Sequence, residues 1–201
     1  MVPPTPQVTS WLLPSSARAP GLRGSFFSTD LTVSNTGSAA AAFTLKFLGN
    51  NRDGRTGTEK SFTLDRGQSV TYPDVLDSVF GLSEGFGAIR ITSATPTLTV
   101  MSQTSTSVAS GGTYGQGVPA AAASDLIVSG LPQSIGGVRE DTAFRTNLIL
   151  ANPGEDPLDV EVKPLRRFAN RRTVIPGSYK SRTSPFLQVS RPAFPDCFVR
   201  W

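Results

Sequence analysis

Apolar and polar residues alternate along several short stretches of the chain, which is the pattern of half-buried β-strands. Within residues 28–35, Thr29, Leu31 and Val33 fall on one side of an extended chain, between polar neighbours. Further stretches of this kind predict strands over residues 8–13, 43–47, 59–64, 68–72, 86–93 and 97–106. Gly- and Asn-containing turns separate them. The pattern therefore predicts an all-β fold.

Three stretches depart from the alternation. Pro14 is predicted to end the first strand, because proline has no N–H for a ladder, and residues 15–24 are predicted to be a loop. Asp74 to Phe80 has helical spacing, with Asp74 in the position of an N-cap. Residues 107–117 are rich in Gly and Ser, which favours another loop.

One segment is present twice. Residues 25–48, moved forward by 117 positions (146 − 29), align without gaps on residues 142–165. Seven of the 24 pairs are identical, where chance would give roughly one or two. The identical pairs are Phe27/Phe144, Thr29/Thr146, Leu31/Leu148, Asn35/Asn152, Gly37/Gly154, Lys46/Lys163 and Leu48/Leu165. A repeat at this spacing predicts two copies of one fold.

The repeat divides the chain into two predicted β-sandwich domains. Residues 1–117 form the first, with an extended proline-containing arm at its start, and residues 118–124 form a linker. Residues 125–201 form the second domain, in which Leu126 to Val128 correspond to the first strand. At its end, residues 198–201 align with residues 88–91.

Nothing after Ile91 in the first copy has a counterpart in the second, so we expect the second domain to lack a final strand. It would then have an unpaired sheet edge. Three explanations are open: the second copy is truncated, it closes with fewer strands, or a strand from another chain completes it. Head-to-tail completion would build a filament. The residues assigned to this assembly are Val8, Trp11, Leu12 and Leu13 as donor and Phe198 and Trp201 at the incomplete domain.

The composition limits the chemistry. The 201 residues include no histidine and one cysteine, Cys197, so neither a Ser-His-Asp nor a Cys-His arrangement can be built, and His/Cys metal sites are excluded. Asp74 and Asp77 could form an acid/base pair, but capping explains them better. We therefore predict no catalytic residue, no metal site and no cofactor.

The net charge is +4, and it is unevenly distributed. Residues 163–191 contain 8 basic side chains and no acidic one. A solvated strand-and-loop face explains this segment better than a nucleic-acid site, because no recognition motif accompanies the charge. No apolar run of 18 residues exists, so no membrane span is expected, and the N-terminal residues have no export-signal pattern.

Three phrases carry a family resemblance: residues 24–31, residues 144–154 and residues 112–116. In them the chain resembles a group of uncharacterised bacterial secreted proteins with repeated F-x-T-D/N-L-x-x-x-N-x-G units. The resemblance covers most of residues 8–165 and implies tandem immunoglobulin-like β-sandwiches, an extracellular or cell-surface location and a non-catalytic role.

Together these features predict a structural or adhesive protein, interpreted as a filament subunit that assembles by β-strand complementation. Its partners would be other copies of itself or cell-surface components. The alternative is a carbohydrate- or protein-binding module of a larger secreted protein. The rings available for stacking on a ligand are those of Trp11, Tyr72, Tyr114 and Trp201.

Overall fold

The computed structural model of the chain describes residues 8–21, 24–50, 52–107, 111–128, 130–131, 133–136, 148–152 and 154. It also describes the backbone of strand residues 159–168, 171–174, 178–180, 186–189 and 197–200. The N-terminal arm, Thr146, Asn147 and Trp201 lie outside these residues.

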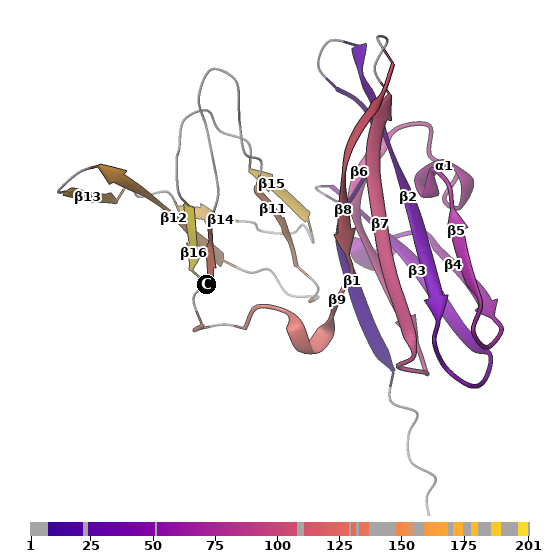
Figure 1. Ribbon diagram of the computed structural model, residues 1–201. Helices are drawn as coiled ribbons and strands as arrows, with labels where there is room; N and C mark the ends of the chain where they lie inside the picture. Colours follow the sequence, from indigo (N-terminus) through magenta and orange to yellow (C-terminus); the bar gives the residue numbers. More distant parts are fainter. Residues whose placement is uncertain are drawn as a thin grey trace, which may run out of the picture.

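Residues 9–122 fold into a two-layer β-sandwich, so the all-β prediction is confirmed. The front sheet has the strand order β5-β2-β7-β8, and the back sheet has the order β4-β3-β6-β1-β9 (Figure 1). The strands are β1 Thr9–Pro20, β2 Phe26–Asn35, β3 Ala41–Gly49, β4 Glu59–Leu64, β5 Ser69–Tyr72, β6 Gly85–Ser93, β7 Leu98–Ser107, β8 Thr113–Pro119 and β9 Ala121–Ala122. The end of β1 also pairs with the start of β2, which joins the two sheets along one path.

The core lies between the sheets and is made by the alternating positions that the sequence indicated. Leu31 and Val33 of β2 face Leu45 of β3 and Ile89 and Ile91 of β6 across the sandwich, and all five are fully or almost fully buried. Burying an aliphatic side chain of this size stabilises a fold by about 1.5–3 kcal/mol. The inner faces of the strands are therefore the main source of stability.

Strand β1 does not end at Pro14, as the sequence predicted. It continues to Pro20 along β6, with a register shift between Leu13 and Ser16. A bulge at this point lets the chain pass a residue that cannot donate to the ladder. Beyond the bulge, the Ser16 hydroxyl donates to the carbonyl oxygen of Gly87 at 2.9 Å.

The first sandwich also extends further along the chain than its predicted boundary at residue 117. Strand β8 pairs with β7, from Thr113 opposite Ser107 to Pro119 opposite Met101. The chain then crosses to the back sheet, where β9 pairs with β1. Residues 118–122, predicted as linker, are therefore part of the sandwich.

Strands after residue 125 repeat one ladder of the front sheet without any change of register. In β2–β5, Leu31 lies opposite Tyr72. Adding 117 gives Leu148 opposite Val189, and this is the observed pair between β11 (Leu148–Ala151) and β15 (Phe186–Val189).

The back-sheet ladder β3–β4 recurs in the same way. In it, Ala42 lies opposite Thr63. Adding 117 gives Asp159 opposite Lys180, the observed pair between β12 (Asp159–Phe168) and β14 (Ser178–Lys180). The same spacing therefore relates ladders in both sheets.

Strand β16 (Cys197–Arg200) pairs with β12 and with β10 (Gln133–Ile135), as β6 pairs with β3 and β1. The pair Val162–Val199 corresponds to Leu45–Ile91, so the offset here is 108 (199 − 91). The connection before β16 is thus nine residues shorter (117 − 108) than the one before β6, which contains the helix α1 (Val75–Ser78).

Two sequence alignments are corrected by these pairs. Residue 199 matches Ile91, so the predicted match of residues 198–201 to residues 88–91 was two positions out. The counterpart of the first strand is β10 and not Leu126 to Val128, which lie outside any strand. Gln133 takes the ladder position of Trp11, and this loss of the apolar residue hid the match.

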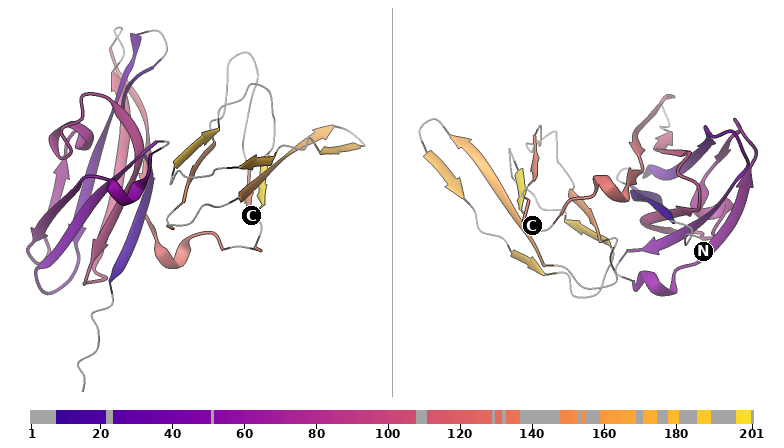
Figure 2. Two further views of the ribbon diagram at one scale, coloured as in Figure 1. Left: turned by 180° about the vertical axis from the view of Figure 1, so that it is seen from behind. Right: turned by 90° about the horizontal axis from the view of Figure 1, so that it is seen from below.

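A second, smaller apolar cluster joins the first sandwich to β11. It lies on the outer face of the back sheet, where Leu12, Leu48 and Ala88 are buried beneath Leu126, Ile149 and Ala151. Strands β10 to β16 stand beside the first sandwich as a separate group (Figures 1 and 2). The hairpin of β12 with β13 (Arg171–Val174) extends away from it.

Candidate functional site

The predicted donor residues are built into their own sandwich. Trp11 is 7 % exposed, and Leu12 and Leu13 are buried as well. Each pairs with β6, as in Leu12 opposite Arg90, and Trp11 and Leu12 also pair with β9. To act as a donor, β1 would have to leave its own back sheet, where it lies between β6 and β9. In this chain the three residues pair within their own back sheet, and their role as a donor strand stays a prediction.

Of the other predicted assembly residues, the structure describes Val8 and the backbone of Phe198, while Trp201 lies outside the described residues. Val8 is 63 % exposed and lines an open hollow of about 490 Å³ on the back sheet. The remaining lining residues come from β3, β4 and β6 and the turn after β6, and are Ala42, Phe43, Thr44, Ser61, Phe62, Thr63, Thr92, Ser93 and Ala94. Phe198 lies in β16, described by its backbone, where it pairs with Lys163 and Ser134.

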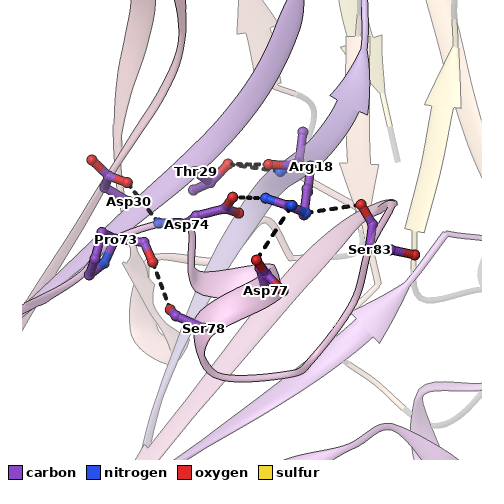
Figure 3. A network of polar contacts seen from close by, with 9 residues as sticks. Arg18, Thr29, Asp30, Pro73, Asp74, Asp77, Ser78 and Ser83 are labelled. Atoms are coloured by element: carbon purple, nitrogen blue, oxygen red, sulfur yellow. Dashed lines mark hydrogen bonds and ion pairs between the residues drawn. The ribbon is translucent and has the colours of Figure 1, made fainter.

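The Thr-Asp pair of the recurring motif is structural in the first sandwich. The fully buried Thr29 hydroxyl accepts from the Ala17 amide at 2.8 Å and also contacts the Ala17 carbonyl oxygen and the Thr104 hydroxyl. One Asp30 carboxylate oxygen accepts from the Asp74 amide at 2.8 Å (Figure 3). In the first sandwich, both side chains of the pair therefore bond the backbone of other segments.

The recurring asparagine forms the same turn in both copies. Asn35 Oδ1 accepts from the Gly37 amide at 3.0 Å, and Asn152 Oδ1 accepts from the Gly154 amide at 2.8 Å. A side chain that bonds the backbone two residues on holds the chain in an Asx-turn. The predicted turn is therefore present at both positions.

An arginine unites the two carboxylates that could have formed an acid/base pair. Arg18 at the end of β1 forms ion pairs with Asp74 and, at 3.4 Å, with Asp77 (Figure 3). Its Nε also donates to the Ser83 carbonyl oxygen at 2.9 Å. Both carboxylates thus share one guanidinium, which ties α1 and the loop after it to β1.

Asp74 does not cap α1 with its side chain, contrary to the prediction. Its backbone is left-handed, with φ 43° and ψ 62°, and its side chain makes no capping hydrogen bond. Such a conformation is costly for a non-glycine residue. It persists here because the ion pair with Arg18 holds the Asp74 side chain, and the hydrogen bond to Asp30 holds the Asp74 amide.

Of the four rings considered for ligand stacking, Trp201 lies outside the described residues, and the other three do not form one surface. Trp11 and Tyr72 pack in the core, and burial raises the pKa of the Tyr72 hydroxyl. Tyr114 is 51 % exposed and contacts Phe27 edge to face, at 5.9 Å between ring centroids. Phe26, 42 % exposed, lies under the Arg18 guanidinium.

The sequence interpretation did not identify Phe26 as a surface residue. The available signal was the doublet Phe26-Phe27 itself. Neighbouring strand residues point to opposite faces, so one of two adjacent apolar residues at a strand start is placed away from the core.

The basic segment, residues 163–191, includes the paired residues of the β12–β13 hairpin, in which Arg167 lies opposite Arg172. Its interpretation as a solvated face remains a prediction. Within the residues the structure describes, no group of three or more His, Cys, Asp or Glu side chains is placed to hold a metal ion. In that same part of the chain, no helix is long and apolar enough to cross a membrane.

No protein-family model matches the chain, and neither does any curated protein. Among solved structures, the chain is similar to that of Thermotoga maritima 1070, with a TM-score of 0.44 and 17 % sequence identity. The match covers 56 % of this chain and 91 % of the Thermotoga chain.

Proposed function

We propose that the chain is a non-catalytic extracellular structural or adhesive protein made from two copies of one immunoglobulin-like β-sandwich. The observation that carries this proposal is that two strand ladders recur within the chain with the same pairing of residues. Both β2–β5 and β3–β4 recur at an offset of 117, in β11–β15 and β12–β14. Repeated structural units along one chain can present extended binding surfaces, as they do in solenoid proteins.

The use of the recurring polar residues supports a structural role. Backbone groups of the same sandwich form hydrogen bonds with the side chains of Thr29, Asp30 and Asn35. The carboxylates of Asp74 and Asp77 are bound by Arg18. The most distinctive side chains of the repeat thus maintain the fold, which leaves strand edges and sheet faces as the surfaces that contact partners.

Assembly through strand edges fits the structure better than donation of β1, because β1 is paired with β6 along most of its length. We therefore propose that the chain is a filament subunit whose copies meet through strand edges. A filament requires two different contacts on each copy.

Immunogold labelling of intact cells that make the full protein, viewed by electron microscopy, tests the location and the assembly together. The expected result is gold on the outer surface, along fibres or in patches between cells. Label that appears only after the cells are lysed would refute the proposal. A protein known to be intracellular, labelled in the same cells, is the control for intactness.

The second candidate function is a carbohydrate- or protein-binding module, and the exposed rings of Phe26 and Tyr114 favour it. Phe26 lies beside Arg18 and Tyr114 lies against Phe27, and exposed rings of this kind suit stacking against sugars or peptides. Glycan-array binding that is lost in Tyr114→Ala and kept in Met101→Ala would support this candidate. Met101 is a matched control because it is 55 % exposed and lies on β7.

A further inference from the structure

The first sandwich has four sheet edges, and three of them are protected against pairing. Strand β4 presents Glu59 and Lys60, both exposed, and charged side chains discourage the approach of another strand. Strands β5 and β9 are four and two residues long. The fourth edge is β8, whose seven residues include no charge.

Strand β8 is open to solvent along its length. Six of its seven residues are exposed, and the seventh, Val118, is partly buried against the core. Along one edge, β8 pairs with β7 over all seven residues. An exposed, uncharged edge strand of this length is a template for pairing with another chain.

Charge does not oppose contact between two such edges. Residues 91–124, which include β7, β8 and β9, contain no Asp, Glu, Lys or Arg. Two copies that meet along β8 therefore bring no like charges together in these strands. Contact through β4 would instead place Glu59 and Lys60 in the interface.

One face of β8 carries two glycines, Gly115 and Gly117, and therefore has no side chains at these positions. A Cβ atom at Gly115 would lie 2.3 Å from the Thr104 carbonyl oxygen, so only glycine allows the strand to lie this close to β7. Gly117 is on the same side of the strand. The opposite side carries Tyr114, Gln116 and Val118, whose spacing sets the possible registers.

We propose that β8 pairs antiparallel with β8 of a second copy of this chain, centred on Gln116. In this register each Tyr114 ring covers Val118 of the second copy, Gly115 lies opposite Gly117, and the two Gln116 amides face each other. A shift of the centre by one residue in either direction would remove Tyr114 from Val118. The two front sheets become one continuous sheet. The proposal rests on the proposed function, because it names one edge through which assembly occurs.

A contact of this kind has two-fold symmetry and closes on two copies. A filament would therefore need a different second contact. The β8 pair accounts for a dimer whether or not fibres form, which lets the two proposals fail separately.

Disulfide trapping tests the β8 register. In a Cys197→Ser background, Gln116→Cys places two thiols opposite each other across the proposed ladder, within the Cα separation that a disulfide needs. Gln103→Cys is the control, since Gln103 is exposed on β7, opposite Gly117 and one strand in from the edge. Mild oxidation should produce the linked dimer of Gln116→Cys at least about tenfold faster than that of Gln103→Cys, because pairing raises the effective thiol concentration.

A charge variant tests the same edge without cysteine. Sedimentation velocity should show a concentration-dependent dimer for the native chain and a monomer for Gln116→Lys, which sets two like charges opposite each other. Equal oxidation rates for the two cysteine variants, or a native chain that remains a monomer at every concentration, would overturn the β8 proposal. If surface labelling succeeds and trapping fails, the β8 proposal alone is wrong; if trapping succeeds and the label is intracellular, the proposed function alone is wrong.

Discussion

Replacing Leu13 with alanine is expected to lower the free energy of unfolding by about 2–5 kcal/mol. Leu13 is fully buried in the main core, next to the bulge in β1. The substitution removes apolar contacts and leaves a cavity that the surrounding strands cannot fill. Chemical denaturation of the dilute monomer, followed by intrinsic fluorescence, measures the change.

Met101→Ala is the matched control for this experiment, because the side chain is apolar, of similar size and mainly exposed on β7. Its effect should stay within about 0.5 kcal/mol. A Leu13→Ala variant as stable as the control would mean that β1 does not belong to its own sandwich in solution. The donor-strand role assigned to Val8 to Leu13 would then return.

Replacing Asn35 with alanine should cost about 3 kcal/mol, since several buried backbone groups lose their partner. The Asn35 amide donates to the carbonyl oxygens of Ala39 at 2.8 Å and of Leu64 and Asp65 at 3.2 Å each. Its Oδ1 accepts from Gly37 and from the Thr97 hydroxyl. One side chain thus joins the β2–β3 turn to the β4–β5 turn and the loop before β7.

Ser34→Ala is the control for Asn35→Ala. The Ser34 hydroxyl is exposed and contacts the Ser69 hydroxyl at 2.8 Å, so its loss should change stability by less than about 0.5 kcal/mol. Thermal unfolding by circular dichroism would compare the two. If Asn35→Ala unfolds at the same temperature as Ser34→Ala, the recurring asparagine is not a structural residue. Its repetition then needs another explanation, such as ligand binding.

The sequence was informative where a strand alternates and has one face in the core. Leu31 and Val33 show this pattern, and the turn at Asn35 to Gly37 follows from side-chain chemistry alone. Both depend on residues that are close in the chain. The strands β2 to β7 could therefore be predicted within a few residues.

The misses involve partners that are distant in the chain. Asp74 has a good capping side chain, but Arg18, 56 residues earlier, takes the carboxylate. Pro14 has no N–H to donate, yet a bulge against β6 carries β1 past it. Gly115 and Gly117 resemble a loop in sequence, and only the closeness of β7 shows why β8 needs them.

The second copy was hardest to align for the same reason. Its offset of 117 holds only from β11 to β15, and the shorter connection that follows changes it to 108. Gln133 also replaces the apolar residue that would have marked the first strand. A gapless comparison cannot follow a deletion of this kind, whereas strand pairing shows it directly.

The most direct test of the account is whether the second copy has the register of the first. In a Cys197→Ser background, two double variants are compared: Thr32→Cys with Thr71→Cys, and Ile149→Cys with Gln188→Cys, which are related by the offset of 117. If the register is the same, an intrachain disulfide forms in both, and none forms in the shifted pair Ile149→Cys with Phe186→Cys. A disulfide in the first double variant together with none in the second, or with one in the shifted pair, would contradict the claim that one sandwich is built twice.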